Sequence, residues 1–268
     1  MNDHRTPLWE REAEAALRAV SIAGELALER PEALGVRAKE SARDIVTDMD
    51  LRIESVLREQ LAPLGHPVVA EESFVMDTDS LPEDRPAFVV DPIDGTANYA
   101  SGLSLYAVSV GLISAGCLVT GAVAIPAHKE LFFTHGDAGA YLNGRALKPP
   151  APCTLSQALV AATFSGRASS RDIRTGEFRL FGQINDASRG CLRLGSAAVN
   201  ICYVAAGRMQ AAYGFDAKLW DVAGALAVAR QAGCAVFVER APGSVVLDYA
   251  VGVAGVVTEI QSFMSEVR

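Results

Sequence analysis

Cysteine and histidine are scarce in this chain of 268 residues, and neither forms a disulfide or zinc motif. The five cysteines are odd in number, widely spread and without a CxxC pair, which argues against a disulfide framework or a zinc ribbon. None of the four histidines has the i, i+4 spacing of a helical zinc pair. We therefore expect a reducing, cytoplasmic location and, for any metal site, oxygen ligands.

Basic residues are outnumbered, since 24 Lys and Arg stand against 32 Asp and Glu, for a net charge of −8. Such a field repels nucleic acid and anionic membrane surfaces, so we expect neither as a partner. A small phosphate ester can still bind if cations reverse the field locally. The length and a hydrophobic share of 50% indicate one or two folded units rather than a disordered chain.

Long apolar runs are few, and the one uncharged stretch, residues 95–127, does not have the pattern of a membrane helix. It contains the turn-forming groups Tyr99-Ala-Ser-Gly and Ser114-Ala-Gly, and its valines favour strands. The first twenty residues are too charged for the apolar core of a signal peptide. We expect buried β-structure at 95–127 and no membrane association.

Apolar periodicity and turn residues predict alternating helices and strands. The polar segment 37–47 is typical of an exposed loop or a short hairpin. The proline-rich segment 148–153 is the best boundary, giving an N-terminal α+β subdomain (1–148) and a C-terminal α/β subdomain (149–268) that share one cleft. We expect helices at 8–29, 48–61, 197–206 and 221–232, and strands at 88–90, 105–113, 118–125, 131–133, 158–162, 209–213 and 235–238.

The most informative motif is Asp91-Pro-Ile-Asp-Gly-Thr96, directly after the apolar run 88–90. A buried strand that ends in carboxylates places them at the edge of a sheet where α/β proteins bind ligands. The amides of Gly95 and Thr96 could then bind an anion. Taken alone, the motif is also compatible with a surface turn capped by Asp94.

Other acidic residues lie where the chain leaves an apolar run: Asp44, Asp48 and Asp50, Glu71 and Glu72, and Asp221. Each has a simpler explanation when taken singly. Asp221 could be only a helix N-cap, Glu71 and Glu72 a solvated loop, and Asp50 a charge on a helix surface. If several converge, their repulsion requires divalent cations, and hard oxygen ligands favour Mg²⁺ or Mn²⁺.

The ordered set DIVTDMD, AEES, VVDPIDGTANY and WDVAGALAVARQAG resembles the inositol monophosphatase family of Mg²⁺-dependent, lithium-sensitive sugar-phosphate phosphatases. The segments YLNGRALK and RLGSAAVNICYVAAG also resemble the family, so the likeness extends over nearly the whole chain. The resemblance implies a layered αβαβα sandwich, a homodimer and a phosphomonoesterase.

Site roles follow from the same resemblance. It implies that Glu71, Asp91 and the carbonyl of Ile93 bind one Mg²⁺, that Asp91, Asp94 and Asp221 bind a second, and that a third ion can lie near Glu71. Two such cations would activate water and stabilise the leaving alkoxide. The resemblance also implies that Asp50 and Thr96 orient the nucleophilic water and that Glu71 takes part in catalysis. The amides of Gly95 and Thr96 would bind the phosphate, and Lys39 would be a mobile-loop lysine near the metals. Asp44 and Thr47 would stabilise a turn.

An aspartyl-phosphate mechanism is disfavoured, because haloacid-dehalogenase enzymes space their two acids as DxDGT whereas Asp91 and Asp94 are three apart. Nor does the chain contain a Walker lysine motif or a GxSxG elbow. The family resemblance instead implies metal-activated water as the nucleophile.

Departures from the family pattern bear on the substrate. Gly214 stands where inositol-specific animal enzymes have a glutamate. Asp216 lies close by and could take the role of that glutamate, although its spacing differs. Ala70 stands where the family motif has a glycine. Ala97-Asn-Tyr is unlike the Lys-Glu-Phe of 3′-phosphoadenosine-5′-phosphate phosphatases. We expect an inositol monophosphatase, with histidinol phosphate and fructose 1,6-bisphosphate as alternative substrates. A regulatory protein that acts on the transcription machinery is the alternative of another class.

Overall fold

A seven-stranded sheet forms the first half of the chain in the computed structural model, which describes residues 8–31, 34–39, 45–76, 80–82, 84–164 and 171–267, without the side chains of 171–174. Only the first pair of strands is parallel, and every later neighbour is antiparallel. The strands, in spatial order, are β3 (Val68–Ala70), β4 (Ala87–Asp94), β5 (Ala107–Ser114), β6 (Cys117–Ile125), β7 (Glu130–Thr134), β8 (Ala140–Leu142) and β9 (Arg145–Ala146).

A five-stranded mixed sheet forms the second half. Strands β11, β10 and β12 are parallel, whereas β14 runs antiparallel to both β12 and β13. The spatial order is β11 (Gly190–Leu192), β10 (Leu159–Thr163), β12 (Ala211–Lys218), β14 (Val246–Gly252) and β13 (Ala235–Glu239). A register shift between Gly214 and Ala217 bends β12 near its carboxyl end.

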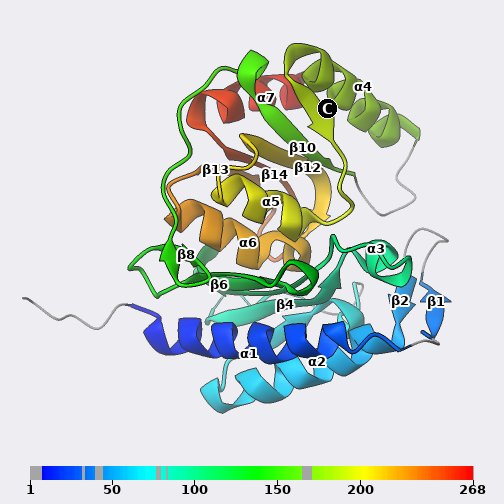
Figure 1. The fold of residues 1–268 in the computed structure, drawn as a ribbon, viewed down its shortest axis with the longest axis vertical. Helices are drawn as coiled ribbons and strands as arrows, with labels where there is room; N and C mark the ends of the chain where they lie inside the picture. The colour runs from blue at the N-terminus through cyan, green and yellow to red at the C-terminus, as the bar shows by residue number, and fades with distance from the viewer. Residues whose placement is uncertain are drawn as a thin grey trace, which may run out of the picture.

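Pairs of helices cover and separate the two sheets, so the molecule has the five layers αβαβα that Figure 1 shows from bottom to top. The resemblance predicted this architecture, and the structure confirms it. Helices α1 (Glu10–Leu28) and α2 (Asp48–Leu61) cover the outer face of the first sheet, α5 (Ala197–Ala205) and α6 (Leu219–Gln231) fill the middle layer, and α4 (Arg171–Ala187) and α7 (Ala254–Val267) cover the second sheet.

Helix α6 packs unusually close to the first sheet. A Cβ atom on Gly224 would lie 2.7 Å from both Ser109 Oγ and the carbonyl oxygen of Val110, so no larger residue fits there. Small neighbours, Ala223 and Ala225, are likewise fully buried. The close contact holds the N-terminal half of α6, and with it Asp221, against β5, in which Ser109 pairs with Asp91 of β4.

The predicted hairpin at 37–47 is confirmed, since β1 (Val36–Ala38) pairs antiparallel with β2 (Ile45–Thr47). The uncharged stretch 95–127 forms the short helix α3 (Thr96–Ala100) and strands β5 and β6, and no described helix is long and apolar enough to cross a membrane. Sequence patterns missed the helices α4 and α7 and the strands β3, β8, β9, β11 and β14. The division at residue 148 stays a prediction, because one core cluster includes residues of both sheets.

Candidate active site

The acidic end of β4 is buried. All eight residues of this strand are buried, and Asp91 and Asp94 are only 1% and 8% exposed. A surface turn capped by Asp94 is therefore wrong as an explanation of the motif. β4 is the second strand of the sheet, has neighbours on both sides and packs against helix α6 of the middle layer.

Three carboxylates from three separate elements meet at this point. Glu71 begins the 3-10 helix Glu71–Ser73 (η2), Asp91 lies on β4, and Asp221 lies in the first turn of α6. One carboxylate oxygen of each lies within 4.8 Å of the others. Burial, and then the repulsion of neighbouring carboxylates, raises the pKa of Asp91 and of Asp221 well above the ordinary range. The cluster is an electrostatically costly arrangement that a divalent cation would stabilise.

Asp94 adjoins this cluster and is bound to the start of α5. Its Oδ2 accepts hydrogen bonds from Ser196 Oγ and from the Ala198 amide, the latter at 2.7 Å. Burial nevertheless raises the pKa of Asp94 to about 7, against the lowering effect of these hydrogen bonds. Ser196 had no role in the sequence interpretation. Its position as the N-cap of α5, which accepts a bond from the Val199 amide, is the signal that could have identified it.

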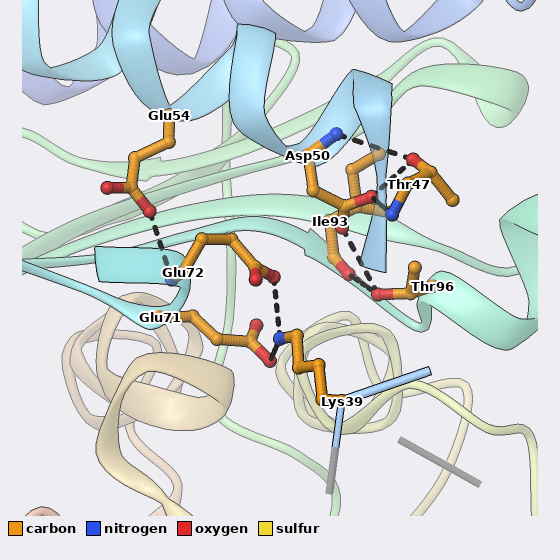
Figure 2. Close-up of polar contacts among 8 residues, drawn as sticks. All are labelled: Lys39, Thr47, Asp50, Glu54, Glu71, Glu72, Ile93 and Thr96. Atoms are coloured by element: carbon orange, nitrogen blue, oxygen red, sulfur yellow. Dashed lines mark hydrogen bonds and ion pairs between the residues drawn. The ribbon is translucent and has the colours of Figure 1, made fainter. Parts of the chain in front are cut away.

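Asp50 and Thr96 meet although 46 residues separate them. Thr96 Oγ1 lies 3.2 Å from Asp50 Oδ1 and 2.9 Å from the Ile93 carbonyl oxygen, as Figure 2 shows. The other oxygen of Asp50 accepts bonds from the Thr47 amide, at 2.8 Å, and the Thr47 hydroxyl, forming a capping box at the start of α2. Asp50 is fully buried, so the alternative of an exposed helix charge is wrong. Burial raises its pKa to about 6.

Lys39 reaches the acidic side chains from the β1–β2 hairpin. Its Nζ lies 2.9 Å from Glu71 Oε1 and 2.7 Å from Glu72 Oε1 (Figure 2). Burial opposes the charged ammonium, but the two carboxylates outweigh this and raise the pKa of Lys39. Burial and the charge of Glu71 raise the pKa of Glu72 to about 7. The Glu72 amide is itself fixed by Glu54 at 3.0 Å, so the η2 turn is held from α2.

Two cavities flank the acidic cluster, and Glu71 and Asp221 line both. The glycine-turn cavity, of about 450 Å³, contains Asp91, Asp94, Gly95 and Thr96 together with Asn98, Thr163, Phe164, Arg193, Ser196 and Asn200. The hairpin cavity, of about 550 Å³, contains Arg37, Lys39, Glu72, Phe74, Asp216, Lys218 and Trp220.

Asp216 lines the hairpin cavity and not the glycine-turn cavity. It adopts a left-handed backbone (φ 46°) at the bend of β12, and its amide donates to Asp248 at 3.0 Å. At Gly214 a Cβ would lie 2.8 Å from Cε1 of Tyr249, so no glutamate fits at that position. Of the other sequence-predicted residues, Glu71, Asp91 and Asp221 converge and Asp94 adjoins them. Asp50 pairs with Thr96, and Asp44 lies outside the described residues.

Sequence comparison identifies relatives over most of the chain. The profile of the inositol monophosphatase family matches residues 8–262. The inositol-1-monophosphatase SuhB of Mycobacterium tuberculosis is 37% identical over 230 residues, which cover 82% of this chain and 78% of that protein. A Pseudomonas aeruginosa relative named Nus factor SuhB is 32% identical over 223 residues, which cover 81% of this chain and 82% of that protein.

Solved structures share the fold. The extragenic suppressor protein suhB from Bartonella henselae superposes with a TM-score of 0.82 at 24% identity, over 96% of this chain and 99% of that one. An IMPase/NADP phosphatase complexed with Mg²⁺ and phosphate superposes with a TM-score of 0.75 at 20% identity, over 92% of this chain and 90% of that one. The chain therefore belongs to the inositol monophosphatase family and is a phosphoric monoester hydrolase.

Proposed function

We propose that the protein is a Mg²⁺-dependent phosphatase that hydrolyses a small phosphorylated polyol by attack of water. The observation that carries the proposal is the buried cluster of Glu71, Asp91 and Asp221, in which Asp91 Oδ1 has no hydrogen-bond partner. A buried carboxylate oxygen without a donor is costly, and a hard cation is the partner that suits it. The Mg²⁺ in the related IMPase/NADP phosphatase supports the same choice of ion.

The residues present fit two such cations. One cation would be held by Glu71, Asp91 and the Ile93 carbonyl, and the other by Asp91, Asp94 and Asp221. Mn²⁺ could replace Mg²⁺, and a third ion could lie near Glu71. All are oxygen donors, and burial raises the pKa of Asp91, Asp94 and Asp221, an effect that bound cations would reverse. When bound, the cations supply charge neutralisation for the attacking water and for the leaving alkoxide.

The protein's own groups orient the reactants. Asp50, held by Thr47, and Thr96, held by the Ile93 carbonyl, form a polar pair that can align a water and accept its proton. The Gly95 and Thr96 amides begin α3 and line the same cavity, where they can bind the ester phosphate. Lys39, which extends from the β1–β2 hairpin, can partly neutralise the negative charge of the phosphate and the carboxylates.

Inositol monophosphate is the first substrate to test, because the Mycobacterium relative is named an inositol-1-monophosphatase. The absence of a carboxylate at Gly214 keeps histidinol phosphate and fructose 1,6-bisphosphate open as alternatives. Purified protein with Mg²⁺ is expected to release phosphate from at least one of inositol 1-phosphate, histidinol phosphate, fructose 1,6-bisphosphate and glycerol 2-phosphate. No release from any of them, with or without Mn²⁺, would contradict the proposal. A homodimer remains a prediction.

A binding or regulatory role without catalysis is the second candidate, because one relative is named a Nus factor. The convergence of the buried acidic cluster with the Asp50–Thr96 pair favours catalysis. Stable binding to transcription proteins combined with no phosphate release would favour the regulatory role instead.

Replacing Thr96 by valine is expected to lower kcat by about a hundredfold, the scale of positioning and proton-transfer contributions, with little change in the Mg²⁺ concentration required. Valine keeps the shape but loses the hydroxyl that joins Asp50 to Ile93. Thr96→Ser, which keeps the hydroxyl, is the matched control and should retain most of the activity. Steady-state kinetics over a Mg²⁺ titration test this, and wild-type kcat in Thr96→Val would remove Thr96 from the mechanism.

Activity should fall on the acid side through the titration of Asp50. Burial raises its pKa to about 6, and a base must be deprotonated, so kcat/KM should decrease as the pH falls through this value. Bound cations favour the carboxylate, which places the apparent pKa at or below about 6. Asp50→Asn should lower kcat by about a hundredfold and remove this acid limb. An unchanged limb in the variant would assign it to another group.

A further inference from the structure

Arg193 lies at the glycine-turn cavity, directly after β11, and takes no part in the mechanism above. Its guanidinium carbon lies 5.1 Å from the centre of the Phe164 ring. Phe164 lines the same cavity and contacts two rings of α4, Phe178 at 5.2 Å and Phe181 at 5.8 Å between centroids. Phe164, which packs at a tilt against these two rings of α4, therefore supports the guanidinium at the cavity.

The polar edge of Arg193 is available to a ligand. A guanidinium that packs against an aromatic ring still has its in-plane N–H groups free to donate. Within the described part of the chain, no carboxylate forms an ion pair with Arg193 and no hydrogen bond from it is found. Other basic groups near the site differ, because Arg37 pairs with Asp48, and Lys39 pairs with Glu71 and Glu72.

The backbone beside Arg193 is fixed against the turn proposed to bind phosphate. The side-chain amide of Asn98, in α3, donates to the carbonyl oxygen of Leu194 at 2.8 Å. Two residues further on, Ser196 donates to Asp94. The segment that follows Arg193 is therefore attached to both sides of the Gly95–Thr96 turn, which fixes the backbone from which Arg193 extends.

We propose that Arg193 binds a second anionic group, a phosphate or a carboxylate, on the ester that this enzyme hydrolyses. The inference rests on the proposed function and narrows its substrate class. Arg193 is the one basic side chain among the described residues that line the glycine-turn cavity. Its planar fork matches two oxygens of a phosphate or carboxylate, whereas a neutral polyol offers it no charge.

The neutral polar groups of this cavity define the rest of the ligand. Thr163 Oγ1 lies 2.8 Å from the Tyr249 hydroxyl and 3.3 Å from the Asn200 side-chain amide, and Thr163 and Asn200 line the cavity. Hydroxyl and amide groups of this kind suit sugar or polyol hydroxyls. The expected substrate is thus a hydroxylated carbon chain or ring with the scissile phosphate near Gly95 and a second anion at Arg193.

Matched substrate pairs test the inference. Fructose 1,6-bisphosphate and fructose 1-phosphate differ only in the second phosphate, and 2-phosphoglycerate and glycerol 2-phosphate differ in a carboxylate. For the wild type, kcat/KM should be higher for the member with the second anionic group in at least one pair. The pair that shows this difference tells whether Arg193 prefers a phosphate or a carboxylate. Arg193→Gln should reduce that specificity ratio by about tenfold or more, the scale of a charged hydrogen-bonding pair.

Two further variants separate binding from folding. Arg193→Lys keeps the charge without the planar fork and should leave an intermediate specificity ratio. Phe164→Leu should raise KM for the bis-anionic substrate more than it lowers kcat, because Phe164 only positions Arg193. Melting curves check that each variant folds. A ratio near one in the wild type, or a ratio unchanged by Arg193→Gln, overturns the inference and leaves the phosphatase proposal standing. No release from any of the four esters, from inositol 1-phosphate or from histidinol phosphate overturns both.

Discussion

Replacing Asp91 by asparagine is expected to abolish nearly all phosphate release while it makes the metal-free protein more stable. The two effects have one cause. Asp91 is buried among Glu71, Asp94 and Asp221, and one of its oxygens has no partner. Asparagine keeps the shape, removes one repelling charge, and cannot offer two anionic oxygens to bridging cations.

The loss of turnover should exceed about a hundredfold, because changes even to the partners of metal ligands cost up to that much. The melting temperature without metal should rise, and the increase on adding Mg²⁺ should shrink. Glu259→Gln, on the exposed surface of α7, is the matched control, since it removes one negative charge away from the cluster and should leave all three quantities unchanged. A fall in metal-free stability combined with wild-type turnover would show that Asp91 is a structural residue only.

The acidic residues could be predicted from the sequence because each stands at an end of an apolar run. Asp91 and Asp94 end a strand, Glu71 follows one, and Asp221 opens a helix. Glu71 and Asp94 lie at the carboxyl ends of the parallel strands β3 and β4, which meet at one edge of the sheet, so their local positions already indicate a shared site. The resemblance to a known family supplied the order of layers, which periodicity alone did not.

Long-range partners were beyond such reasoning. Ser196 reaches Asp94 across 102 residues, and no local pattern records that contact. Strand β14 was missed because Asp248, only 2% exposed, interrupts its apolar run, and this residue accepts a bond from the Asp216 amide at the bend of β12. Helix α4 contains Gly176 and Gly182, which weaken a helical pattern. Ser196 and Asp248 were thus missed because their partners lie on other elements.

The same contacts explain why the site holds its shape despite its charge. Asp94 is fixed by the start of α5, Asp50 by the capping box of α2, and Glu72 by Glu54. Lys39 places one ammonium between Glu71 and Glu72. These bonds offset part of the cost of burial and repulsion, which together still raise the pKa of Glu72, Asp91 and Asp94.

The stability of the metal-free protein should therefore fall as the pH rises. Burial and mutual repulsion raise the pKa of Asp91 and Asp221 well above the ordinary value, and raise the pKa of Asp94 to about 7. Between the unfolded-state value near 4 and these folded-state values, the folded chain holds more protons than the unfolded chain. Its free energy of unfolding then decreases by about 1.4 kcal/mol per pH unit for each extra proton held.

Melting curves at about pH 5.5 and about pH 8, with EDTA and with Mg²⁺, measure this effect. Without metal the midpoint should be lower at the higher pH, and a difference of about 2 kcal/mol would correspond to about 4 to 8 °C. Mg²⁺ requires the deprotonated carboxylates, so it should raise the midpoint more at the higher pH, whereas NaCl at matched ionic strength should not. In Asp91→Asn both the pH dependence and the Mg²⁺ effect should be smaller. Equal stabilisation by Mg²⁺ at the two pH values would mean that the cation binds outside the cluster of Glu71, Asp91 and Asp221, and the proposed metal site would then be wrong.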